Sequence, residues 1–321
     1  MRPPIAPAAL RPPSGREWDF GDYPYGLEPV LLPAPDDRMP AAGEPARREL
    51  RESFRALADA AAAGFTPTEP AVGDALTERL FWFRWIAGHH VSFIIWRLLS
   101  DALRQVHDGT GDQAALARAI IAYVRAYSGM MIYTGSPNRS IYHNVIRPSM
   151  HRQHTTFSGT WAPDYPAVRS LFRGRKLPPV IPAQAAELNR EIQLANRIHV
   201  GVASKLVAGG RSLLQQSIDE RGGPQPRMWG AIFDCYFVTV RAPVTAQQVT
   251  AQLLRRLKAI AIDIATNGLY PLSPDDAQVP DELRGPDVAE CERDLVCQLL
   301  QMGGLAVGAT ADPAPTPLRT G

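Results

Sequence analysis

The 321 residues are enough for one large domain or two ordinary ones, and an apolar fraction of 45% supplies a sizeable core. Basic and acidic residues, 34 and 32, nearly cancel to a net charge of +2, which disfavours a nucleic-acid partner or a membrane surface. No stretch approaches the roughly 18–20 apolar residues of a membrane span. The three cysteines form no CxxC motif, so we expect a reduced, cytoplasmic protein.

The chain is predicted to be mainly α-helical. Residues 1–45 are rich in proline and lack periodicity, which predicts an irregular arm packed on the body. A single helical domain is expected over residues 46–302, followed by a flexible tail, 303–321. The predicted helices, in chain order, cover residues 44–63, 74–106, 113–133, 139–147 (stopped by Pro148), 183–208, 212–220, a helix that begins at Thr245, and 288–302.

Two stretches do not fit a regular helix. Residues 155–182 form a long irregular connection, and connections of this length inside a domain tend to be functional. Residues 229–240 contain an apolar run whose type the pattern does not decide.

His89 and His90 lie in the middle of the most apolar predicted helix. A buried imidazole costs free energy unless it is hydrogen-bonded or binds a ligand, so each is either a satisfied core residue or a functional one. Adjacent helical positions point about 100° apart, so the two histidines cannot share one role.

His199 is the only histidine on the helix predicted over 183–208, and its neighbours are small or aliphatic. Such neighbours would let a flat macrocycle approach the helix, as an axial haem ligand requires. The alternative is an ordinary core or surface histidine.

Three further histidines, His143, His151 and His154, lie near Tyr142 and Arg147. His151 and His154 are spaced to share a helical face, but no carboxylate nearby completes a metal site. A polar substrate rim is therefore the preferred interpretation.

Two segments resemble tryptophan 2,3-dioxygenase, a histidine-ligated haem enzyme. One is His90-x5-Trp96, the family's pattern around its distal histidine, with His90 in register and His89 as its neighbour. The other is His199, followed by Gly209-Gly210 where the family's proximal histidine precedes a glycine-rich turn. The resemblance implies a helical bundle that binds haem.

The sequence is still more similar to the haem-dependent L-tyrosine hydroxylases of the lincomycin, hormaomycin and pyrrolobenzodiazepine pathways. Residues 128–136, 141–150 and 157–165 carry this resemblance, together with the aromatic arm around Phe20, and it spans roughly residues 18–300. It implies a peroxygenase-type monooxygenase of secondary metabolism that converts L-tyrosine to L-DOPA with hydrogen peroxide. It also makes a homodimer plausible.

A relative that hydroxylates 3-methyltyrosine carries a cysteine four residues after its proximal histidine, and that cysteine attaches the haem covalently. Ala203 occupies this position here. We therefore expect non-covalent haem b, and the alanine argues against the 3-methyltyrosine branch.

The resemblance implies the following roles. His199 would be the axial ligand of the haem iron, and His90 would shuttle the peroxide proton on the opposite face. Arg147 would pair with the substrate carboxylate, the alternative being a structural ion pair. The remaining candidate substrate contacts are Asn144, Tyr142 and Ser136.

Other functions stay open at this stage. A haem dioxygenase that opens the ring of a tryptophan-like substrate would share the fold and both histidines. A non-catalytic haem-binding protein would bind haem without turnover. A helical regulatory protein without haem and a non-haem di-histidine iron enzyme are the remaining alternatives.

Overall fold

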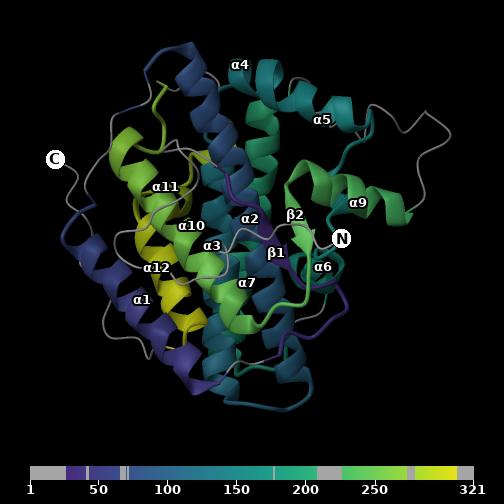
Figure 1. The fold of residues 1–321 in the computed structure, drawn as a ribbon, viewed down its shortest axis with the longest axis vertical. Coiled ribbons are helices and arrows are strands. Elements are labelled where there is room, and N and C mark those ends of the chain that lie inside the picture. Colours follow the sequence, from purple (N-terminus) through teal and green to yellow (C-terminus); the bar gives the residue numbers. More distant parts are fainter. Residues whose placement is uncertain are drawn as a thin grey trace.

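The computed structural model describes residues 27–40, 43–65, 70, 72–175, 178–207, 226–272 and 279–308. Over these ranges the protein is mainly helical, as predicted, with a single two-stranded sheet (Figure 1). In chain order the elements are β1 (Val30–Leu32), α1 (Glu44–Ala62), α2 (Asp74–His107), α3 (Gln113–Thr134), α4 (Arg139–Ile141), the π-helical turn η2 (Tyr142–Ile146), α5 (Arg147–Gln153), the 3-10 turn η3 (Gly159–Trp161), α6 (Pro166–Phe172), α7 (Pro182–Leu206), α9 (Pro226–Tyr236), β2 (Thr239–Arg241), α10 (Ala246–Asn267), the 3-10 turn η6 (Asp281–Leu283), α11 (Pro286–Arg293) and α12 (Leu295–Ala306).

Helix α2 is the axis of the bundle. It packs on α3 and α10, and α3 in turn packs on α7 and α12 (Figure 1). The middle of α2 is buried on every side, which explains why apolar residues cover most of its surface. None of the helices in the described ranges is both long and apolar enough to cross a membrane.

Side-chain caps fix the starts of two predicted helices. The Asp112 side chain accepts hydrogen bonds from the backbone N–H groups of Ala114 and Ala115 at the start of α3. Thr245 and Gln248 form a reciprocal capping box at the start of α10. The predicted start at Thr245 is therefore confirmed.

The segment of uncertain type, residues 229–240, contains both helix and strand. It holds most of α9 and the first residues of β2, which pairs in parallel with β1 so that Val30 lies opposite Thr239. Gln252 of α10 bonds to both the N–H (2.7 Å) and the C=O (2.9 Å) of Leu31. This side chain thus supplies the hydrogen bonds that a third strand would otherwise make.

The predicted helix stop at Pro148 is wrong. The chain continues as a helix from Arg139 to Gln153, and the π-helical turn lies directly before the proline. In that wider turn the N–H of Arg147 bonds to the carbonyl of Tyr142. Pro148 then takes an initial position of α5, and the wider turn before it accommodates the missing N–H without ending the helix.

Three other boundaries differ from the prediction. The connection 155–182 contains η3 and α6, and the last predicted helix, 288–302, is divided between α11 and α12. Helix α12 continues to Ala306, four residues past the predicted helix end at 302. The helix predicted over 212–220, the pair Gly209-Gly210 and most of the arm 1–45 lie outside the described residues.

A buried guanidinium anchors the first half of α2. Arg84, fully buried, donates to both carboxylate oxygens of Asp263 in α10, at 2.8 and 3.1 Å. It also donates to the carbonyls of Gly268 (2.7 Å) and Leu269 (2.6 Å). The Tyr133 hydroxyl donates to the same carboxylate at 2.6 Å. The charge is therefore paired and its donors are satisfied, which burial requires.

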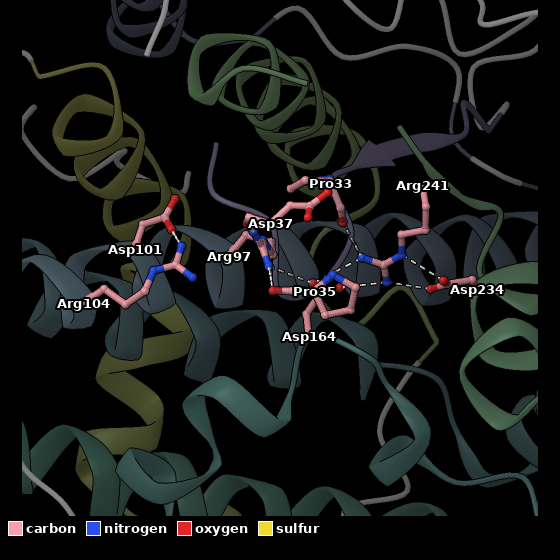
Figure 2. Close-up of polar contacts among 9 residues, drawn as sticks. All are labelled: Pro33, Pro35, Asp37, Arg97, Asp101, Arg104, Asp164, Asp234 and Arg241. Carbon is pink, nitrogen blue, oxygen red and sulfur yellow. Dashed lines mark hydrogen bonds and ion pairs between the residues drawn. The ribbon is translucent and has the colours of Figure 1, made fainter. Parts of the chain in front are cut away.

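A second buried guanidinium, Arg97, anchors the other half of α2. It donates to the carbonyls of Pro35 and Asp37, the latter at 2.6 Å, and lies 3.6 Å from the Asp164 carboxylate (Figure 2). The irregular segment that follows β1 is thereby tied to the bundle.

Arg241 of β2 approaches the same aspartate from the other side (Figure 2). It lies 2.9 Å from Asp164 and 2.7 Å from Asp234, and it donates to the carbonyl of Pro33 at 3.1 Å. Asp164 thus lies between two cations that come from α2 and from β2.

We predict that Asp263→Asn lowers the free energy of unfolding by about 3–5 kcal/mol, because the amide leaves the buried Arg84 charge without its bidentate partner. Denaturant unfolding would measure the loss. The matched control is Glu52→Gln, which removes an exposed pair with Arg48 and should change nothing measurable. Equal effects of the two substitutions would contradict this account of Arg84.

Candidate functional site

His89 lies among aromatic side chains, and its Nε2 has no hydrogen bond in the part of the chain that the structure describes. Its Nδ1 lies 2.6 Å from the Trp85 carbonyl, so Nδ1 carries the proton and donates it, and the lone pair is on Nε2. The imidazole stacks on Phe237 with a centroid distance of 4.5 Å and lies 4.3 Å from the Trp85 ring. Burial lowers the pKa of His89 to about 4, so the ring is neutral near pH 7.

His90, one position further along α2, is enclosed by protein. Its Nε2 lies 2.5 Å from the Phe237 carbonyl, and Arg256 donates from Nε to its Nδ1 at 3.3 Å. Both ring nitrogens are therefore occupied, and the side chain is only 1% exposed. A proton shuttle at His90 would require one of these two hydrogen bonds to open, and the role stays a prediction.

A chain of hydrogen bonds joins three elements beside His89. The indole N–H of Trp85 donates to the Tyr236 hydroxyl at 3.1 Å. The Ser149 hydroxyl donates to the Ile146 carbonyl at 2.6 Å, so its oxygen accepts from Tyr236 at 2.9 Å. The proton positions are thus determined, and α2, α5 and α9 are held together next to His89.

The π-helical turn brings Tyr142 and Arg147 to this group. The Tyr142 ring meets Trp85 edge-on at 6.2 Å. Burial raises the pKa of the Tyr142 hydroxyl, and the hydrogen bond from Arg147 opposes that rise. Such single π-helical turns are frequent at functional sites, because they reorient side chains without ending the helix. Here the turn places a guanidinium close to the aromatic group around His89.

The other two candidate contacts lie apart from this group. Ser136 is buried and accepts a hydrogen bond from Arg84 at 3.1 Å, which makes it part of the structural network around Asp263. Asn144 is exposed and donates to the Ser140 hydroxyl at 3.1 Å.

The three remaining candidate histidines of this region do not converge. The Nε2 of His143 is buried without a protein partner in the described part of the chain. His154 accepts a hydrogen bond from the Thr156 N–H at 3.1 Å, and His151 is exposed. Among the residues with described positions, no group of three or more His, Cys, Asp or Glu side chains could hold a metal ion.

His199 lies on the exposed side of α7, next to Val200, an aliphatic side chain that is 50% exposed. The protein around it lowers the pKa of His199 by desolvation, which favours the neutral imidazole. Within the described residues, no hydrogen bond or ring contact joins His199 to His89.

The end of α7 is nevertheless fixed to the segment that leads into the π-helical turn. Lys205 donates to the Gly135 carbonyl at 2.9 Å, and Arg139 donates to the Lys205 carbonyl at 3.2 Å. A Cβ on Gly135 would lie 2.6 Å from the Val202 side chain, so only glycine allows this approach. The helix of His199 and the segment of Arg147 therefore form one packed unit.

Sequence reasoning missed Trp85, Ser149, Tyr236 and Phe237. Trp85 could have been found, since it lies four residues before His89 on one helical face. Tyr236 and Phe237 come from the segment of undecided type, where no local pattern shows that they meet α2.

Comparison with known proteins agrees with a redox enzyme. Residues 36–189 match the family model described as SfmD 3-methyl-L-tyrosine peroxygenase. This segment is just under half of the 321 residues; it contains His89 and Arg147 and ends before His199 and Ala203. No curated protein matches the chain significantly. Over residues 36–189 the chain is therefore similar to the SfmD peroxygenases, and this similarity supports an oxidoreductase that acts on tyrosine derivatives.

Proposed function

We propose that the protein is a haem-dependent peroxygenase that hydroxylates L-tyrosine at C3 to L-DOPA with hydrogen peroxide, in secondary metabolism. The observation that carries the proposal is the geometry of His89, whose Nε2 is an unprotonated acceptor within an aromatic group that also includes Tyr142, hydrogen-bonded to Arg147. The match of this segment to a tyrosine-derivative peroxygenase supports it independently.

His199 of α7 is the residue that would hold the haem iron, which needs a neutral imidazole. His199 is exposed and has no hydrogen-bonded partner in the described part of the chain, and the neighbouring Val200 is exposed as well. The space at Gly201 is filled by Leu283, so a macrocycle would approach the helix from the side of His199 and Val200. Ala203 offers no thiol, so we propose haem b without a covalent bond to the protein. Bound haem would supply the iron at which peroxide is activated.

His89 would handle the peroxide proton. Its neutral Nε2 can accept that proton from one peroxide oxygen and return it to the other, while the Nδ1–H bond to the Trp85 carbonyl keeps the ring in one tautomer. The register of His-x5-Trp assigned this role to His90. The geometry favours His89, because both nitrogens of His90 are already paired.

Arg147 would bind the carboxylate of the amino acid. A guanidinium pairs with a carboxylate through two parallel hydrogen bonds, and the Tyr142 hydroxyl already orients this one. Trp85 and its aromatic neighbours offer an apolar surface to the phenol ring. Asn144 and Ser136, also expected to contact the substrate, have protein partners and contribute less to this proposal.

The choice of L-tyrosine over its 3-methyl derivative rests on the resemblance to the L-tyrosine hydroxylases and on Ala203. Incubation with hydrogen peroxide and each compound in turn, with quantification of the catechols, tests it. A clear preference for the 3-methyl compound would overturn the substrate assignment and keep the reaction type. Consumption of oxygen with tryptophan would favour a ring-opening dioxygenase instead. The homodimer suggested by the resemblance also remains a proposal.

His199→Ala should abolish the Soret band of the purified protein, or weaken haem binding by about tenfold or more, because the axial ligand is lost. His107→Ala is the control, since His107 is exposed at the far end of α2. An unchanged spectrum in His199→Ala would exclude this histidine as the ligand.

His89→Gln should lower kcat for catechol formation by about 10²–10⁴-fold, since an amide cannot take up a proton near neutral pH. In the wild-type enzyme, kcat/KM should fall as the pH drops through about 4, where His89 becomes protonated and Nε2 can no longer accept. His90→Gln, which conserves a donor toward Phe237, should retain most of the activity. If His90→Gln lowers kcat more than His89→Gln does, the shuttle role would return to His90.

Arg147→Met should raise the KM for L-tyrosine by about tenfold or more, because a charge-assisted hydrogen bond to the carboxylate is lost. With tyramine, which has no carboxylate, the same substitution should leave KM unchanged. Arg169→Met on the exposed face of α6 is the matched control. An equal rise in KM for both substrates would mean that Arg147 has a structural role.

A further inference from the structure

Phe237, which stacks on His89, lies at a strained point of the backbone. The next residue, Val238, has φ of +50°. A β-branched side chain rarely adopts this left-handed conformation, which glycine usually occupies at the end of a helix. Val238 is 39% exposed, so packing of its own side chain does not compensate for the strain. Something else must hold this link between α9 and β2.

Hydrogen bonds from three elements hold the link. The N–H of Val238 bonds to the Cys235 carbonyl at 3.2 Å, and the N–H of Val30 in β1 bonds to the Val238 carbonyl at 3.1 Å. The third bond, at 2.5 Å, joins His90 Nε2 to the Phe237 carbonyl, and it comes from the core of the bundle.

The donors and acceptors around His90 permit one arrangement. A guanidinium can only donate, so the bond from Arg256 requires that Nδ1 of His90 accept, and the ring proton is then on Nε2. Arg256 is itself held by the carbonyls of Gln252 and Glu28, both at 3.1 Å. Helix α10 therefore sets both the tautomer and the orientation of His90.

We propose that His90 is a positioning residue, whose hydrogen bond to the Phe237 carbonyl holds the strained link and keeps the Phe237 ring stacked on His89. The inference rests on the role proposed for His89. Without the bond, Val238 can relax out of its left-handed conformation, and the ring moves with the backbone. Water then reaches the imidazole that the ring covers.

The exposure of His89 to water is measurable through its titration. Burial is the main cause of its low pKa, and the Trp85 carbonyl opposes it. The ionisable groups on the surrounding elements include His90 in α2, Arg256 in α10, Tyr236 in α9, and Tyr142 with Arg147 around the π-helical turn. None of these groups changes when the Phe237 ring alone is displaced.

Two substitutions at position 90 separate the two hydrogen bonds. Asparagine can place its oxygen near Nδ1 and accept from Arg256, but it is too short to reach the Phe237 carbonyl. Glutamine extends a donor to the position of Nε2. Val238→Gly, added to His90→Asn, removes the reason for the link to relax, because glycine accepts a positive φ without strain.

NMR titration of ¹³C-histidine-labelled full-length chain, without added haem, is the test, with the His89 signal assigned by its loss in His89→Gln. We expect a midpoint near 4 in the wild type. In His90→Asn it should rise by about one pH unit or more as desolvation is relieved. His90→Gln and the double variant His90→Asn/Val238→Gly should titrate close to the wild type.

A wild-type midpoint in His90→Asn, or equal shifts in the Asn and Gln variants, would overturn the proposal. If His90→Asn does not fold, Phe237→Leu is the second variant. It keeps the backbone hydrogen bond and removes the ring, so the midpoint of the His89 titration should rise. An unchanged midpoint would also overturn the proposal. The titration requires no turnover, so its outcome is independent of whether L-tyrosine is hydroxylated.

Discussion

The architecture depends on guanidinium groups buried inside the bundle. Arg84, Arg97 and Arg256 are among the largest fully buried side chains of the described protein. A buried charge is tolerated only when it is paired and its donors are satisfied. Arg84 meets this requirement through Asp263, and all three guanidinium groups donate to backbone carbonyls of a segment outside the helices: residues 268–269 for Arg84, 35–37 for Arg97 and 28–29 for Arg256. The helices thereby fix the course of the irregular chain.

The same constraint sets the register of α2. Arg84 and Arg97 anchor it at two points, and His89 and His90 lie between them. With rotation about the helix axis fixed, successive side chains about 100° apart must face different surroundings. One imidazole meets Arg256 and is held as a neutral acceptor, and the other meets the aromatic group with its Nε2 open. Two chemically identical neighbours thus adopt different tautomers: the ring proton is on Nδ1 in His89 and on Nε2 in His90.

Sequence reasoning succeeded where a local pattern was sufficient. Apolar periodicity located α1, α2, α3 and α7, and the start of α10 was correctly predicted at Thr245. It failed at Pro148, because the usual rule that proline ends a helix does not anticipate the preceding π-helical turn. It chose His90 over His89 from the register of His-x5-Trp, whereas the hydrogen-bond partners that distinguish the two rings include Arg256, more than 160 residues away along the chain. The burial of the arginines could not be predicted from the sequence, since an arginine in an apolar helix also fits a partly exposed position.

The segment that matches the peroxygenase family does not form the site alone. His89, Tyr142 and Arg147 belong to residues 36–189, whereas Tyr236, Phe237 and Arg256 come from the remaining half. The side chains from residues 36–189 would act on peroxide and substrate. The second group sets the tautomer of His90, covers His89 and holds Trp85 through its indole N–H. Substitutions in α9 or α10 can therefore change the protonation of His89 without touching the substrate, which would let related chains keep the same reacting residues and still differ in pH dependence.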